Sequence, residues 1–228
     1  MTKRFDGKTA VDGLSFAVER GETVAVVGPN GAGKSTTFLC LAGLLRPDAG
    51  TIAFDDAPLG AMRGRTIALI PETPEVFPLL TVWEHLAFAA ALTKQPPGWQ
   101  ARADALVERL RLGGERDTLG SALSKGMRQK TLIAATVVAG APVLLLDEPL
   151  IGLDPLGQRE LRAIVADLRA EGHAILVSTH LLESAASMCD RMLVLDRGRL
   201  VASGTIDELR ARRADGSLED VFLEVTGS

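Results

Sequence analysis

Cysteine is scarce in this 228-residue chain, which contains only Cys40 and Cys189. Neither lies at a spacing typical of metal ligands, so both are expected to be reduced, buried thiols in a reducing compartment. An excess of one charge is also lacking, because 25 basic and 29 acidic residues give a net charge of −4. No block of like charges stands out, and a nucleic-acid surface is therefore not expected.

The chain also lacks a hydrophobic run long enough to cross a bilayer. Its longest apolar stretch, 131–146, is interrupted by Gly140 and Pro142 and ends at Asp147. A membrane-spanning helix needs about 20 apolar residues, so this stretch is predicted to be a helix followed by a buried strand. The polar N-terminus has no signal-peptide pattern. If the protein acts at a membrane, another chain must cross it.

The clearest motif that is present is a glycine-rich run at 28–36, between the apolar run 24–27 and a helix-compatible run at 36–42. This is the phosphate-loop pattern, in which glycines let successive backbone N–H groups surround a phosphate at a helix N-terminus. Lys34 can reach the outer phosphates, and the Ser35 hydroxyl can ligate Mg²⁺. We expect nucleotide contacts from Gly28, Pro29, Asn30, Gly31, Ala32, Gly33, Lys34, Ser35 and Thr36.

Predicted strands and helices alternate along much of the chain. Strand signals cover 14–27, 51–70, 143–146, 174–178, 192–195 and 200–203, and helices are expected at 156–170 and 181–188. This alternation predicts a mainly parallel α/β sheet. A helical insert separates the two halves: a capping box at Thr81 and Glu84 begins one helix, and a second runs from about 100 to 112. Another capping box begins at Ser217 and predicts a short terminal helix.

Two apolar strands end in side chains that suit phosphate chemistry. The strand at 143–146 leads into Asp147 and Glu148, and the strand at 174–178 leads to His180. At the edge of the sheet beside the phosphate loop, Asp147 can hold Mg²⁺ and Glu148 can face an attacking water. His180 can hydrogen-bond a γ-phosphate, although a lone histidine is more often structural. We interpret His85 and His173 as structural.

A further segment, Leu-Ser-Lys-Gly-Met at 123–127, precedes a helix. Ser124 followed by Gly126 is ordinarily a helix cap. The same geometry can bind a phosphate, and composition does not decide between the two.

Together these motifs resemble the nucleotide-binding subunit of an ATP-binding-cassette (ABC) transporter over essentially the whole chain, most closely the ABC-2 branch, which works with export-type membrane subunits. The resemblance implies an α/β P-loop NTPase (RecA-like) core with an antiparallel β subdomain and an α-helical subdomain. A single domain would span 1–228. The core with its β subdomain would comprise 1–71 and 141–228, and the helical subdomain 72–140.

The resemblance also implies a role for each matching residue. Ser124 and Gly126 fall in the family's signature motif, Asp154 falls in its D-loop, and Phe5 stands where an aromatic residue stacks on adenine. Catalysis would use Glu148, His180 and Lys34, and Mg²⁺ would be held by Ser35, Asp147 and Glu72.

By the same resemblance, the protein is an ATPase that binds ATP and Mg²⁺, with no other metal, and drives transport. A second ATPase subunit, expected to form a homodimer, would sandwich two ATP molecules with the first. The other partner would be an integral-membrane permease, and no nucleic acid is expected. The subunit would lie peripherally on the cytoplasmic face of the cell membrane, with its permease-facing groove around 72–80.

Three features depart from the family pattern. Lys125 and Met127 replace the usual glycine and glutamine of the signature, and Glu72 replaces the usual Q-loop glutamine. An ionised carboxylate can bind Mg²⁺ but cannot donate a hydrogen bond. The chain also starts so close to Phe5 that the family's first strand is expected to be truncated or absent.

Two alternatives to a transporter subunit stay open. A non-transport ABC ATPase, such as a translation factor or an iron–sulfur assembly ATPase, is one, although the translation-factor type usually has two cassettes. A coiled-coil chromosome-type ATPase would need long heptads, which 78–140 lack. A small-molecule or nucleotide kinase is the other, and it leaves the signature and D-loop motifs unexplained.

Overall fold

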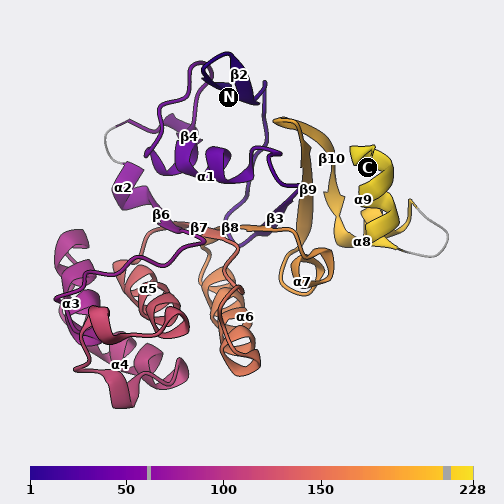
Figure 1. The fold of residues 1–228 in the computed structure, drawn as a ribbon. Coiled ribbons are helices and arrows are strands. Elements are labelled where there is room, and N and C mark those ends of the chain that lie inside the picture. Colours follow the sequence, from indigo (N-terminus) through magenta and orange to yellow (C-terminus); the bar gives the residue numbers. More distant parts are fainter. Residues whose placement is uncertain (61–62, 213–216, 228) are drawn as a thin grey trace.

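Six strands form the central sheet of the computed structural model, which describes residues 1–60, 63–212 and 217–227 (Figure 1). Their order is β10-β9-β3-β8-β7-β6, and every neighbouring pair is parallel except β9 with β10. This confirms the predicted, mainly parallel α/β sheet. The strands are β3 (Thr23–Val27), β6 (Ile67–Ile70), β7 (Val143–Asp147), β8 (Ala174–Thr179), β9 (Arg191–Asp196) and β10 (Arg199–Thr205).

The central strands are buried and mostly apolar because helices cover both faces of the sheet. All residues of β3 and β8 are buried, as expected for strands covered on both sides. Helix α1 (Lys34–Ala42) lies on one face, and α5 (Lys125–Ala139), α6 (Pro155–Ala170) and α7 (Leu182–Ala186) lie on the other (Figure 1). Alternate strand residues therefore belong to two separate cores, such as Val24 on the α1 side and Ala25 on the other.

The predicted helical insert is present between β6 and β7. It consists of α3 (Val82–Thr93), α4 (Trp99–Arg109) and α5, with short 3₁₀ turns at Gly113–Glu115 and Gly120–Ala122. Thr81 and Glu84 form the predicted capping box of α3. Helix α4 ends before the predicted residue 112, because Arg111 adopts a left-handed φ of 56° that turns the chain.

The strand predicted over 14–22 is wrong, since the chain is irregular there. Gly13 and Gly21 bracket this segment with positive φ, and its alternating residues have no strand ladder beside them. Outside the central sheet, two antiparallel strand pairs lie among the described residues: β1 (Lys3–Phe5) with β2 (Lys8–Val11), and β4 (Ala53–Phe54) with β5 (Ala57–Pro58). The strand signal over 51–70 is thus only partly right, because α2 (Arg63–Thr66) interrupts it. Strand β1 is only three residues long.

The C-terminal part adds two helices beside β10 (Figure 1). Helix α8 (Ile206–Arg210) was not predicted, although Thr205 and Glu208 form its capping box. Helix α9 (Leu218–Thr226) follows Ser217 as predicted, whereas α7 is shorter than the expected 181–188. Both cysteines are buried, as predicted. No helix in the described part of the chain combines the length and hydrophobicity needed to span a bilayer.

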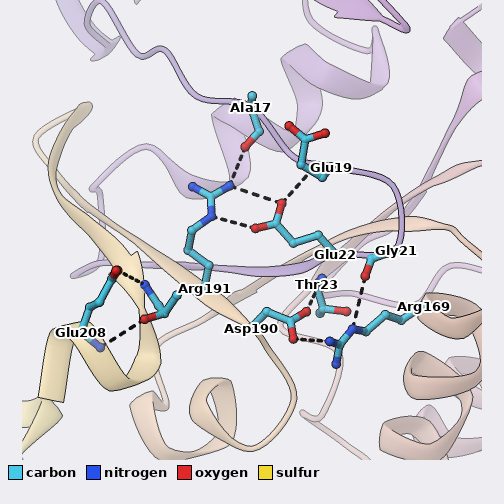
Figure 2. Close-up of polar contacts among 10 residues, drawn as sticks. Ala17, Glu19, Gly21, Glu22, Thr23, Arg169, Asp190, Arg191 and Glu208 are labelled. Atoms are coloured by element: carbon cyan, nitrogen blue, oxygen red, sulfur yellow. Dashed lines mark hydrogen bonds and ion pairs between the residues drawn. The ribbon is translucent and has the colours of Figure 1, made fainter.

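Two arginines join elements where β3 and β9 begin (Figure 2). Arg191 donates from Nε to Glu22 Oε1 at 2.7 Å and from Nη2 to the Ala17 carbonyl oxygen at 2.6 Å. Arg169, on α6, forms an ion pair with Asp190 at 2.6 Å. These contacts fasten the irregular segment before β3 to the sheet without strand pairing.

Candidate functional site

A cavity of about 510 Å³ opens where the loops that follow β3, β7 and β8 converge. Side chains from distant parts of the sequence meet there. The lining residues are Phe5, Lys8, Ala10, Asn30, Gly31, Ala32, Gly33, Lys34, Ser35, Thr36, Glu72, Asp147, Glu148, Ile151 and His180. The structure thus brings most of the predicted nucleotide, metal and catalytic residues to one place. Lys8, Ala10 and Ile151 were not predicted, and no sequence motif marks them.

Two glycines of the phosphate loop are required by close backbone approach. A Cβ on Gly28 would overlap the Leu195 carbonyl oxygen, and a Cβ on Gly33 would overlap that of Ala10. Gly33 also has a φ of 100°, which other residues rarely adopt, and it precedes the first turn of α1. That turn contains no acidic residue, so the positive end of the helix dipole is available to an anion.

Lys34 is half-buried in this loop, and its Nζ donates to the Gly28 carbonyl oxygen at 2.6 Å. Burial lowers the pKa of Lys34, and this effect outweighs the opposing influence of Glu148, Asp147 and Glu72. The ammonium group therefore faces three carboxylates while backbone carbonyls solvate it. A bound phosphate would supply a stronger partner than those carbonyls.

Asp147 ends β7 with only 7% of its surface exposed. The Ser178 hydroxyl, at the end of β8, donates to Asp147 Oδ1, and the Glu148 N–H donates to the Ser178 carbonyl oxygen at 3.0 Å. Ser178 therefore fixes both acidic residues. Its role was not predicted, and the signal for it is its position two residues before His180, near the end of an apolar strand.

The donor set at this cavity fits Mg²⁺. Asp147 and the exposed hydroxyl of Ser35 offer oxygen atoms, which Mg²⁺ prefers, usually with phosphate oxygens and waters completing its shell. In the parts of the chain that the structure describes, no three His, Cys, Asp or Glu side chains are grouped to hold a metal alone.

Glu148 and His180 form a direct pair above Asp147. Glu148 is 8% exposed and has a left-handed φ of 47°, and its Oε1 lies 2.8 Å from His180 Nδ1. Because a carboxylate only accepts, Nδ1 must carry the hydrogen. Half of the His180 side chain is exposed, and its Nε2 can donate to a phosphate only when both ring nitrogens carry a hydrogen.

Five predicted nucleotide-binding residues lie outside the cavity lining: Gly28, Pro29, Ser124, Gly126 and Asp154. Gly28 and Pro29 belong to the phosphate loop itself, where their carbonyl oxygens accept from Lys34 Nζ. Ser124 is exposed and caps α5 by accepting the Met127 N–H at 3.3 Å. Asp154 is 61% exposed and caps α6 by accepting the Gly157 N–H at 2.6 Å. Within one chain, Ser124 and Asp154 act as ordinary helix caps, and Gly126 lies in the first turn of α5.

Comparison with known proteins identifies the family. A family profile described as ABC transporter matches residues 11–151, more than half of the chain. The chain belongs to the ABC transporter family of ATP-binding proteins. It is an ATP-binding, ATP-hydrolysing subunit of a membrane transport system, and a kinase or a non-transport ABC ATPase is not favoured.

Individual relatives agree with this assignment. The chain is 34% identical to the lipopolysaccharide export system ATP-binding protein LptB of Haemophilus influenzae, over 92% of this chain and 90% of that protein. It is 38% identical to the Nod factor export ATP-binding protein I of Ralstonia nicotianae, over 97% of this chain and 70% of that protein.

A solved structure of an ATP-binding subunit of an ABC transporter superposes with a TM-score of 0.93 at 35% identity, covering 99% of this chain and 96% of that one. The cbiO1 protein of Clostridium perfringens, part of the cbiONQ transporter complex, gives 0.77 at 29% identity, covering 96% of both chains. The predicted ABC ATPase fold is therefore confirmed.

Proposed function

We propose that this chain powers an ABC-2-type exporter from the cytoplasmic face of the membrane, as one of two identical ATPase subunits bound to a permease. The direction of transport is supported by the two relatives named above, whose names both specify export. The observation that carries the mechanism is the incomplete ATP cavity. The phosphate loop and the Glu148–His180 pair line it, while Ser124 and Asp154 are exposed elsewhere.

A second copy would complete each cavity. Residues 28–36 of one subunit would hold ATP, and Ser124 and Gly126 of the other would cover its γ-phosphate. Phe5 is 42% exposed at the cavity and would stack on adenine. A subunit alone would then be a poor ATPase, because half of each site would be missing.

The chemistry assigned to the residues follows from their placement. Glu148, held beside the cavity by its bond with His180, would orient or deprotonate the attacking water. Lys34 would bind the γ-phosphate, and His180 would donate to it from Nε2 with both ring nitrogens protonated. Mg²⁺, held by Ser35 and Asp147, with Glu72 able to join through water, would offset the phosphate charge.

The permease would bind the docking segment, defined as residues 72–80 at the start of the helical subdomain (72–140). Phe77 is 54% exposed and Leu79 is 81% exposed, and Phe88 of α3 is 47% exposed beside them. The rings of Phe77 and Phe88 meet edge to face at 5.4 Å. Large exposed apolar side chains that cluster in this way mark an interaction surface, and a short helix of the permease would fit it.

Co-purification tests this proposal. A tagged chain extracted from its own membranes should bring with it a multispanning permease. Cysteine at Leu79, labelled with a bifunctional reagent, should crosslink to that permease, whereas a matched cysteine at Leu223 on α9, which is 47% exposed, should not. Crosslinks from Leu223 alone, or ATPase activity without any membrane partner, would contradict the proposal.

A further inference from the structure

The docking segment is bonded along its backbone to a second stretch of the helical subdomain, residues 116–123, which we name the pre-signature segment because Ser124 follows it directly. An antiparallel bridge pairs Thr81 with Leu119. Flanking backbone hydrogen bonds join Gly120 to Leu80 (2.8 Å), Ser121 to Pro78 (3.1 Å), Val82 to Thr118 (3.1 Å) and Trp83 to Arg116 (3.0 Å). Pro78 and Leu80 are the docking-segment residues in these bonds, and the pairing continues through Thr81 into the first turn of α3.

Gly120 sets how closely the segments approach. A Cβ at this position would overlap the carbonyl oxygen of Phe77 and lie 3.0 Å from Val76 Cγ2. The glycine has no left-handed φ, so its backbone conformation is open to any residue. The absence of a side chain is needed only for the contact with the docking segment.

His85, on α3, holds the backbone of Phe77, the residue that Gly120 approaches. It is 5% exposed, its Nε2 accepts the Phe77 N–H at 2.9 Å, and its Nδ1–H donates to the Thr81 carbonyl oxygen at 2.6 Å. The His85 and Phe77 rings stack with their centroids 6.0 Å apart. The Phe77 backbone is therefore anchored although its ring faces outward.

The pre-signature segment has little freedom to absorb a displacement before it reaches Ser124. The 3₁₀ turn Gly120–Ala122 is followed by buried Leu123 and then by Ser124, the cap of α5. Arg128 on α5 also donates to the Ser121 carbonyl oxygen at 3.3 Å. These contacts connect the pre-signature segment to the start of α5.

We propose that Gly120 and His85 are positioning residues that couple the docking segment to Ser124. A permease helix on Phe77 and Leu79 thereby sets where Ser124 stands over the ATP of the second subunit. The inference rests on the proposed ATP-sandwich dimer. Because energetic coupling between two sites is reciprocal, ATP-driven closure on Ser124 must also alter the docking segment, and this can be measured without the permease.

The first test uses the Glu148→Gln chain, in which ATP should hold the dimer together. Gly120→Ala in that background should raise the dissociation constant of the ATP-dependent dimer about tenfold, within the usual range of coupling energies. ATP affinity of the monomer should stay unchanged, since the phosphate loop is in the core. Gly114→Ala is the matched control, because nothing lies within 4 Å of its Cβ.

The outcomes separate the two proposals. If the Glu148→Gln parent does not dimerise with ATP, both the proposed dimer and this inference are overturned. A parent that dimerises, together with Gly120→Ala dimerising equally well, overturns this inference alone. Loss of monomer ATP affinity in Gly120→Ala also overturns it, because the glycine would then serve the general fold.

A second pair of variants covers the case in which Gly120→Ala does not fold. The amide oxygen in His85→Gln can accept the Phe77 N–H where Nε2 did, whereas the shorter side chain in His85→Asn can replace only Nδ1. Both are neutral amides. We expect ATP-driven dimerisation to survive in His85→Gln and to weaken in His85→Asn, while thermal unfolding midpoints of the two stay similar. Equal dimerisation of the pair would overturn the role of His85.

A spin label tests the coupling itself. Leu79→Cys can be labelled selectively because both native thiols are buried and burial raises their pKa values, that of Cys189 to about 12. In the Glu148→Gln background, ATP should change the mobility of the label at residue 79. The change should disappear with Gly120→Ala and persist with Gly114→Ala. If ATP does not change the mobility of the label in the Glu148→Gln parent, the proposed coupling is overturned.

Discussion

His180 donates its Nδ1–H to Glu148 Oε1 across 2.8 Å, from the loop after β8 to the end of β7. The bond fixes the tautomer of the histidine and points the carboxylate at one partner before any nucleotide binds. In this position Glu148 has a left-handed backbone conformation, which is uncommon for residues other than glycine. Strain of this kind is tolerated at functional sites.

Glu148→Gln should abolish steady-state ATP hydrolysis while leaving ATP bound. The amide can still accept the His180 hydrogen but cannot take a proton from water, and loss of a general base costs about 10²–10⁴-fold. Phosphate release measures turnover, and gel filtration with ATP should reveal a trapped dimer. Glu183→Gln, at an exposed carboxylate on α7, should hydrolyse ATP normally. Near-normal hydrolysis in Glu148→Gln would remove Glu148 from the reaction.

Lys34→Ala should weaken ATP binding. It removes the cation that now donates to the Gly28 carbonyl oxygen, and charge-assisted hydrogen bonds contribute about 1.5–3 kcal/mol, roughly 10- to 100-fold in affinity. Calorimetry on folded protein gives the dissociation constant. Lys130→Ala, whose ammonium lies outside the cavity near Asp154, should bind ATP as the unmodified chain does. Unchanged affinity in Lys34→Ala would contradict the phosphate-loop assignment.

Glu72→Gln should raise the Mg²⁺ concentration needed for half-maximal hydrolysis while keeping ATP binding. Glu72 adds a third carboxylate to a cavity that holds Asp147 and Glu148, and a carboxylate there attracts the cation. Glu72 is exposed, so solvent screens it and the shift should be about two- to fivefold, smaller in high salt. Glu75→Gln, exposed in the same segment, is the control. Identical Mg²⁺ titrations would show that Glu72 does not act on the metal.

The parts of the site that were predictable are those encoded locally. In the phosphate loop and at the ends of β7 and β8, an apolar strand is followed directly by glycines or by polar side chains. Because β3, β8 and β7 pair in parallel, these strand ends meet at one edge of the sheet. The strand expected at 14–22 failed because a strand needs a paired neighbour far along the chain, and that segment is instead held by Arg191 and Glu22.

Other features were hidden for different reasons. Helix α8 had a readable signal in Thr205 and Glu208 that was overlooked. The contact of Gly120 with Phe77 joins residues 43 positions apart, and no local pattern reports such an approach. Ser124 cannot be told from a simple helix cap within one chain, because its proposed ligand lies on the other subunit.

Glu22 accepts a hydrogen bond from Arg191 Nε where β3 begins (Figure 2). Burial by itself would raise the pKa of Glu22, but hydrogen bonds from Arg191 and from the Glu19 N–H outweigh it, so the pKa lies below its usual value. A carboxyl group whose pKa is lowered by folding stabilises the fold above its unfolded pKa, and this contribution is lost as pH falls through the folded pKa.

Glu22→Gln should therefore lower the free energy of unfolding near neutral pH by about 1–2 kcal/mol, since the ion pair is mostly buried. At about pH 3, below the ordinary pKa of glutamate, the two chains should differ much less, because Glu22 is then losing its charge too. Urea unfolding at both pH values measures this. Glu19→Gln, at an exposed neighbour, should change stability little at either pH. A Glu22→Gln penalty that stayed constant with pH would mean that packing, rather than the charge on Glu22, joins this segment to β9.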